Sequence, residues 1–187
     1  MLSNVVDKDK GIKMYLISIY FDRQTNKILQ RYIDKIADRT DNHFMIDNHV
    51  PPHMTIASIE ARNIDVLKPA FAALNGKLYS GSMRIVSVGQ LFPYVMYAMP
   101  VLNQNLFKLS WEVYNAFCDI PETTMSEYYK PFSWLPHITL GKTLDKVQMQ
   151  KAFQAMQESF IPFTAQFEEI GLAKVNPHED AVRFKLL

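Results

Sequence analysis

The chain has 187 residues, of which 48% are hydrophobic and 21% are charged, values typical of a globular protein with room for a sizeable core. Its net charge of +1 excludes the strong basic field that grips long duplex nucleic acid, although local charge can hold a nucleotide or a short RNA end. Residues 1–13 do not read as a signal peptide, no segment reads as a membrane span, and the only cysteine, Cys118, excludes an intrachain disulfide, so we expect a cytoplasmic protein.

The first half of the chain alternates between apolar strands and amphipathic helices. Residues 14–22 are rich in β-branched and aromatic side chains, which predicts a buried strand. Residues 23–41 carry apolar side chains at i, i+3 and i+4, which predicts a helix. A polar loop then leads to further predicted elements, which are a strand at 53–59, a helix at 64–78 and a hairpin of strands at 83–92 and 95–101.

The second half repeats this order, with a helix at 103–119, a loop at 120–133, a strand at 135–140, a helix at 145–160, and strands at 163–175 and 181–187. Two equal offsets support an internal repeat. His53 and His137 lie 84 positions apart, and so do Pro93 and Pro177, each of which falls at a predicted turn. Such a duplication predicts two similar α+β lobes related by an approximate two-fold axis.

Each half contains one copy of a short string that alternates polar and apolar residues. Residues 52–56 read Pro-His-Met-Thr-Ile, and residues 136–140 read Pro-His-Ile-Thr-Leu. Side chains alternate faces along a strand, so each histidine shares a face with the threonine two residues later. Each predicted strand therefore buries an aliphatic face and presents a histidine and a hydroxyl on the other.

These side chains suit the cleavage of a phosphodiester. Histidine titrates near neutral pH, so one histidine can act as a general base and the other as a general acid. Threonine hydroxyls can donate hydrogen bonds to phosphate oxygens as charge develops. We therefore predict His53 and His137 as catalytic residues and Thr55 and Thr139 as phosphate-binding residues. This scheme requires neither a metal nor a cofactor.

The two strings, with the second extended over residues 135–142, resemble the two-histidine phosphoesterase superfamily of 2'-5' RNA ligases and cyclic phosphodiesterases. The resemblance covers residues 14–187. It implies a single bilobal, pseudo-duplicated α+β domain over residues 1–187, with two antiparallel sheets flanked by helices around a central groove.

The same resemblance implies metal-independent chemistry on 2',3'-cyclic phosphates or 2'-5'-linked nucleotides and RNA ends, including reversible 2'-5' RNA ligation. Many relatives carry an arginine a few residues beyond the second string, where it helps to hold the substrate. Lys142 stands there in this chain and keeps the charge but not the bidentate fork, so we assign it to the substrate phosphate. Strict alternation would turn Lys142 away from His137 unless the strand bulges.

Other hypotheses stay open at this stage. The protein is expected to act as a monomer on a nucleotide or RNA end, away from membranes. One alternative is a non-catalytic RNA-binding or partner-binding module that retains the fold, although such a module has no need of two proton-transfer groups. Another is a metal-dependent hydrolase, but the spacing of His43, His49 and His53 fits no standard zinc signature. The strings do not decide which histidine is the acid.

Several aromatic residues and one further histidine also require an interpretation. The loop that contains Tyr128, Tyr129, Lys130, Phe132 and Trp134 either stacks a base or packs on the surface. Tyr20 and Phe21, at the end of the first strand, could line the groove, and we expect at least one of them in the core. His178 falls in a predicted turn, where an exposed side chain is expected.

Overall fold

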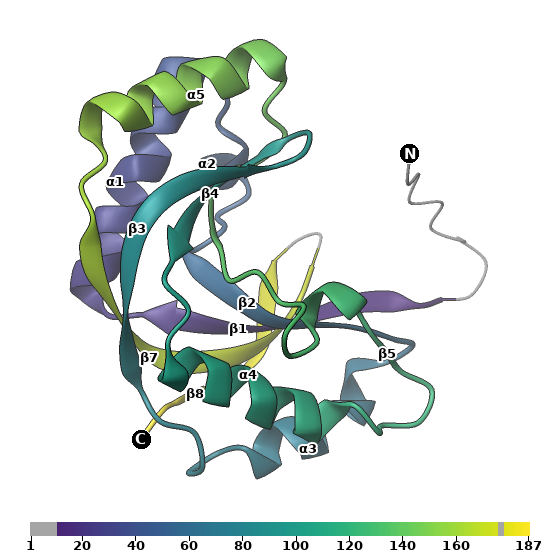
Figure 1. Cartoon of the computed structure of the whole chain (residues 1–187). Coiled ribbons are helices and arrows are strands. Elements are labelled where there is room, and N and C mark those ends of the chain that lie inside the picture. Colours follow the sequence, from purple (N-terminus) through teal and green to yellow (C-terminus); the bar gives the residue numbers. More distant parts are fainter. Residues whose placement is uncertain (1–10, 176–177) are drawn as a thin grey trace.

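Antiparallel strands form the centre of the molecule, and helices cover them on two sides (Figure 1). The computed structural model describes residues 11–175 and 178–187. Helices α1 and α5 lie on one side of the strands, and α3 and α4 lie on the other. The strands are β1 (Lys13–Phe21), β2 (His53–Ala61), β3 (Gly81–Leu91), β4 (Val95–Pro100), β5 (Thr124–Met125), β6 (Ile138–Gly141), β7 (Phe163–Lys174) and β8 (Glu179–Lys185). The α-helices are α1 (Arg23–Thr40), α2 (Phe44–Asp47), α3 (Lys68–Ala73), α4 (Gln104–Phe117) and α5 (Lys146–Ser159).

All strand pairings are antiparallel, and the strands form one continuous eight-stranded sheet in the order β1-β2-β6-β4-β3-β7-β8, with β5 beside β2. β1, the first strand in this order, also pairs with β7, so the strands from β1 to β7 form a closed ring of pairings. The α+β class is confirmed, but the two expected sheets are joined. The reason is the length of β3, which pairs with β7 through Gly81–Ile85 and with β4 through Ile85–Leu91.

Most predicted elements are present, and the differences have local causes. The helix expected at 64–78 is a 3₁₀ turn at Ile64–Val66 followed by α3, because Pro69 is tolerated only in the first turn of an α-helix. β6 begins three residues later than predicted, because Pro136 has no N–H to donate to a neighbouring strand. The predicted turn at Asn176-Pro177 and the segment before residue 11 lie outside the described residues.

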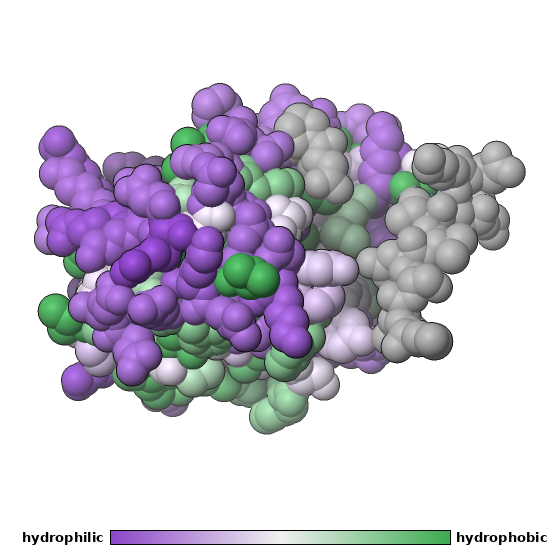
Figure 2. All heavy atoms as spheres, turned by 90° about the horizontal axis from the view of Figure 1, so that it is seen from above, coloured by the Kyte–Doolittle hydropathy of each residue, from purple (hydrophilic) through white to green (hydrophobic). Residues whose placement is uncertain are grey.

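The core lies between the strands and both helical layers. α1 begins at Asp22, whose carboxylate accepts a hydrogen bond from the Thr25 N–H at 2.8 Å. It packs on α5 and β6, and the outer surface of this layer is largely hydrophilic (Figure 2). On the other side, α4 packs against β2 and β3. Within residues 11–175 and 178–187, no helix has the length and apolar character needed to cross a bilayer. The two motif strands are thus held from both sides.

A capping box at the start of α5 predicts a measurable stability effect. The Asp145 carboxylate accepts from the Val147 and Gln148 N–H groups at 2.8 Å, and the Gln148 side chain accepts from the Asp145 N–H at 3.0 Å. Because losing such a cap costs ~1 kcal/mol, Asp145→Ala should lower the free energy of unfolding in urea by that amount. Asp38→Ala, at an exposed position of α1, should cause no comparable loss. Equal losses in both variants would contradict the role of the cap.

Candidate active site

The two motif copies meet where β2 and β6 pair. Met54 lies opposite Ile138 in an antiparallel register, and both side chains are fully buried. Alternation places the polar motif residues on the other face of these strands. This register places His53 opposite Thr139 and Thr55 opposite His137. The two histidines are therefore diagonal neighbours across the strand pair, for which Cα atoms lie about 7–8 Å apart. The structure therefore brings the four predicted residues together.

Both histidines have the same local hydrogen bond. The His53 Nδ1 lies 2.8 Å from the Pro51 carbonyl oxygen, and the His137 Nδ1 lies 2.9 Å from the Leu135 carbonyl oxygen. A carbonyl oxygen can only accept, so Nδ1 carries the proton in each ring and Nε2 is the free atom. The repeated proline-histidine dipeptide thus produces the same tautomer and ring orientation twice. Each Nε2 is able to accept or return a proton.

The threonines differ in how open they are. Thr55 is buried, with its hydroxyl 3.4 Å from the Ser18 hydroxyl, whereas Thr139 is partly exposed. The Trp134 indole N–H donates a hydrogen bond to the Thr55 carbonyl oxygen at 3.2 Å. This bond connects the segment that precedes His137 to β2. Trp134 is therefore a packing residue of the aromatic loop.

Two other aromatic members of that loop, Tyr128 and Phe132, remain on the surface, whereas Tyr129 packs against the core. Tyr128 is 72% exposed and Phe132 is 86% exposed. The Phe132 ring contacts the rings of Phe107 and Trp111, with centroids at 5.0 and 6.2 Å. The loop is thus divided between packing and exposed aromatic surface.

A tyrosine from the neighbouring strand flanks each histidine. The Tyr20 ring centroid lies 6.3 Å from His53, and the Tyr97 centroid lies 5.6 Å from His137 in an edge contact. Phe21 packs in the core, as expected for one of this pair. Tyr97 was not predicted as a site residue, because its position depends on the pairing of β4 with β6.

Two glycines leave space for these rings. A Cβ on Gly89 would lie 2.5 Å from the Tyr97 Cζ, and a Cβ on Gly171 would lie 2.9 Å from the Tyr20 Cε2. A larger residue would therefore displace the ring beside each histidine. Neither glycine stands out in the sequence, because each contact joins different strands.

The expectation that His178 is exposed is wrong. Its side chain is 8% exposed, and its ring stacks on His53 with centroids 5.0 Å apart and planes at 27°. The cause is the pairing of β8 with β7, which places the start of β8 at the edge of the site. Sequence periodicity gives no signal for a contact between residues so far apart.

The structure does not bring Lys142 into the histidine group. Lys142 is exposed just after β6, and its ammonium lies over the Phe44 ring at 5.4 Å from the centroid. Its predicted contact with a substrate phosphate would require the side chain to leave Phe44. That assignment stays a prediction.

Burial sets the protonation state of the histidines. Burial lowers the pKa of His53 to about 4, while the Pro51 carbonyl opposes this shift and His178 adds to it. Burial also lowers the pKa of His137. Both rings are therefore neutral at pH 7 in the free protein, and each offers an unprotonated Nε2. A bound phosphodiester anion would favour protonation of one of them.

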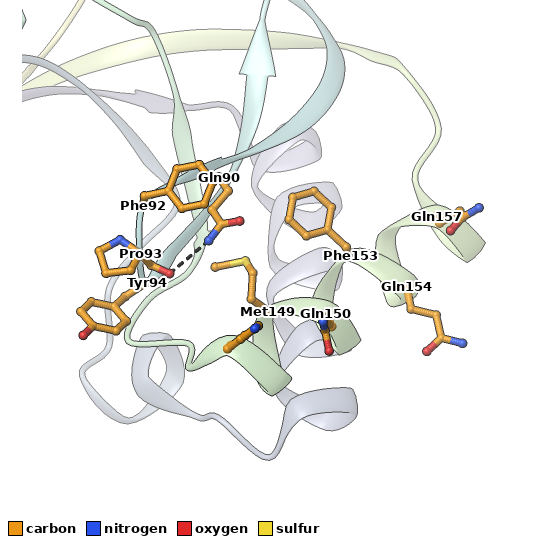
Figure 3. A pocket seen from close by; sticks show the side chains of 10 residues that line it. Gln90, Phe92, Pro93, Tyr94, Met149, Gln150, Phe153, Gln154 and Gln157 are labelled. Carbon is orange, nitrogen blue, oxygen red and sulfur yellow. Dashed lines mark hydrogen bonds between the residues drawn. The ribbon is translucent and has the colours of Figure 1, made fainter.

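Two cavities lie near the site, and neither is lined by His53 or His137. A cavity of about 560 Å³ is lined by Tyr20, Pro51, Arg183 and the α1 residues Arg23 and Lys27, so it extends from the His53 side of the site. A larger cavity of about 680 Å³ lies between the β3–β4 hairpin and α5, and its glutamine and aromatic lining includes neither histidine (Figure 3).

Among the described residues, no group of three metal-ligating side chains comes together.

Comparisons with known proteins identify a family and a shared fold. A family model described as the 2'-5' RNA ligase superfamily matches residues 28–179. Escherichia coli LigT, crystallised with 3'-AMP, is 14% identical, with a TM-score of 0.62 over 94% of this chain and 98% of that chain. The protein TT0787 of Thermus thermophilus is 15% identical, with a TM-score of 0.61 over 92% of this chain and 97% of that chain. No curated protein matches the sequence.

The neutral state of His53 predicts that acid destabilises the fold. Its folded-state pKa of about 4 lies below the ordinary value of 6.5, so the unfolded chain binds more protons between these pH values. The free energy of unfolding in urea should therefore fall as the pH is lowered from about 7.5 to about 5. His53→Gln should reduce this pH dependence, whereas the exposed-site control His49→Gln should retain it. An identical dependence in all three proteins would contradict a partly buried, neutral His53.

Proposed function

Because the chain belongs to the 2'-5' RNA ligase superfamily, we propose that it is a phosphodiesterase that uses His53 and His137 for acid–base catalysis. Its proposed substrates are 2',3'-cyclic phosphates or 2'-5'-linked nucleotides at RNA ends, with 2'-5' RNA ligation as the reverse reaction. The observation that supports this most directly is the matched pair of histidines, each with Nδ1 bound to a backbone carbonyl and Nε2 free.

The reaction follows from these two free nitrogen atoms. For a 2',3'-cyclic phosphate, the Nε2 of one neutral histidine removes a proton from the attacking water as its oxygen bonds to phosphorus. The opposite phosphorus–oxygen bond breaks, and the protonated histidine on that side gives its proton to the leaving ribose oxygen. The hydroxyls of Thr55 and Thr139 donate to the phosphate oxygens as charge develops. In ligation, an RNA hydroxyl takes the place of water.

The rest of the substrate needs a surface beside the reacting phosphate. The cavity next to Pro51 is lined by Arg23 and Lys27, which suit a nucleotide attached to that phosphate. Its lining also includes Glu168, and Glu169 paired with Arg183. Escherichia coli LigT has been crystallised with 3'-AMP, ATP and NADP+, and this supports a nucleotide ligand for the present chain. We further propose that the enzyme works as a monomer in the cytoplasm, consistent with its exposed, unpaired Cys118.

Substitution of the catalytic pair tests the proposal. His53→Ala and His137→Ala should each lower kcat by at least ~10²-fold, because a positioned acid or base contributes that much. Thr55→Val and Thr139→Val should also lower kcat through lost hydrogen bonds to the transition state. Steady-state kinetics on a 2',3'-cyclic nucleotide measure these effects, with the exposed His43→Ala as the control. Full activity in both histidine variants would exclude the mechanism.

A substrate panel separates the competing hypotheses. We expect the wild-type protein to turn over a 2',3'-cyclic nucleotide or a 2'-5'-linked dinucleotide, and to keep this activity in excess EDTA. Activity that EDTA removes would instead favour a metal-dependent hydrolase. RNA binding without turnover, unchanged in His53→Ala and His137→Ala, would favour the non-catalytic binding module. Product analysis by mass spectrometry also reports whether hydrolysis or ligation occurs.

A further inference from the structure

His178 is a buried titratable side chain that the mechanism above does not use. Its ring is stacked on His53, with centroids 5.0 Å apart. Its Nε2 lies 3.2 Å from the Tyr20 hydroxyl oxygen, and that hydroxyl donates its proton to Asp180. A tyrosine has one hydroxyl proton, so its oxygen accepts from His178, and Nε2 of His178 carries a proton. The hydrogen bonds therefore fix the orientation of His178.

A surrounding network holds these partners in place. The Arg183 guanidinium lies over the Tyr20 ring at 3.5 Å from the centroid and forms ion pairs with Asp180 and Glu169. Gly171 faces the same cluster, and a Cβ there would lie 2.9 Å from the Tyr20 ring and 3.2 Å from the Asp180 Oδ1. Strands β1, β7 and β8 all contribute, so this corner of the sheet holds His178 against His53.

The second histidine has no such neighbour. In the part of the chain that the structure describes, the aromatic contact of His137 is the edge of Tyr97, and no imidazole stacks on it. The two catalytic rings otherwise match, because each donates its Nδ1 proton to the carbonyl two residues earlier. The stacked imidazole of His178 is therefore the main chemical difference between the two sides of the site.

We propose that His178 is a positioning residue that makes the two catalytic histidines unequal, reserving His53 as the proton acceptor and leaving His137 as the proton donor. This inference rests on the proposed phosphodiesterase function. The attacking hydroxyl or water loses its proton to Nε2 of His53, and Nε2 of His137 gives a proton to the leaving oxygen. His178 keeps its own proton throughout, and exchange with solvent restores the starting protonation of the pair.

Burial lowers the pKa of His178, so its ring is neutral at neutral pH and carries the Nε2 proton described above. As the pH falls, a positive charge on His178 repels a second one on the stacked ring of His53. Only one ring of such a pair accepts a proton readily, because a second positive charge about 5 Å away in a partly dry site is unfavourable. The groups that face the pair are Tyr20 from β1, His137 near β6, Glu169 from β7, and Asp180 and Arg183 from β8. The nearest carboxylate, Asp180, lies 3.8 Å from the His178 Nε2 and favours a positive charge on His178 over one on His53, although burial still lowers the pKa of His178. His53 is then left neutral and ready to accept.

The test compares His178→Gln and His178→Phe with the wild-type protein. Both variants remove the second titratable ring, and phenylalanine retains an aromatic surface against His53. The pH profile of kcat/KM should shift its acidic limb to higher pH in both, because His53 becomes easier to protonate, while the alkaline limb stays in place. In addition, kcat at neutral pH should fall about tenfold through a less well-placed ring, with a smaller change in KM. Tyr20→Phe, which loses the hydroxyl partner of His178, should shift the acidic limb in the same direction.

A measurement without substrate separates this inference from the proposed function. NMR titration of the His53 Cε1–H signal should give a higher pKa in His178→Gln and His178→Phe than in the wild-type protein. The exposed-site control His49→Gln should leave that pKa unchanged. An unchanged His53 titration would overturn the role of His178, even if the protein is an active phosphodiesterase. A shifted titration in a protein without turnover would support the stacking effect and contradict the proposed function.

Discussion

The pairing of Met54 with Ile138 is the contact on which the rest of the site depends. It joins β2 to β6, and in doing so it places two strings 84 residues apart on one face of the sheet. Both side chains are fully buried, and burying an aliphatic side chain contributes about 1.5–3 kcal/mol. A slip of one residue would turn either histidine to the opposite face, so the buried aliphatic face also fixes the register of the polar one. Core packing and the geometry of the candidate site are thus one constraint.

The site also depends on leaving two histidines neutral. Burial removes water from His53 and His137, which disfavours their charged forms. The Pro51 and Leu135 carbonyls satisfy Nδ1 and leave Nε2 as the atom that exchanges protons. In the proposed reaction the phosphodiester is an anion, so its arrival would supply the charge that favours protonating one ring. The protein therefore sets the orientation and hydrogen bonding of both rings, and under the proposed function the bound substrate would determine when one becomes charged.

The features that depend on neighbouring residues in the sequence were predicted well. Alternation within each string gives the shared face of His53 and Thr55, and apolar periodicity gives α1 and the β3–β4 hairpin. The sequence prediction gave too little weight to two prolines. Pro69 restricts α3 to a shorter helix, and Pro136 makes β6 begin later than predicted. Tyr97 could not be predicted as a neighbour of His137, because that contact arises from cross-strand pairing, which a single sequence does not specify. His178 was misjudged for the same reason.

An internal repeat predicts two equal halves, yet the completed site is not symmetrical. The repeat reproduces the backbone hydrogen bond of each histidine, since that bond depends only on residues adjacent in sequence. The surroundings depend instead on which strands lie alongside, and β8 adds His178 to the His53 side only. In the proposed reaction one histidine takes a proton while the other gives one, so the two rings must hold opposite protonation states. The repeat supplies the pair, and tertiary packing around β8 supplies the difference between its members.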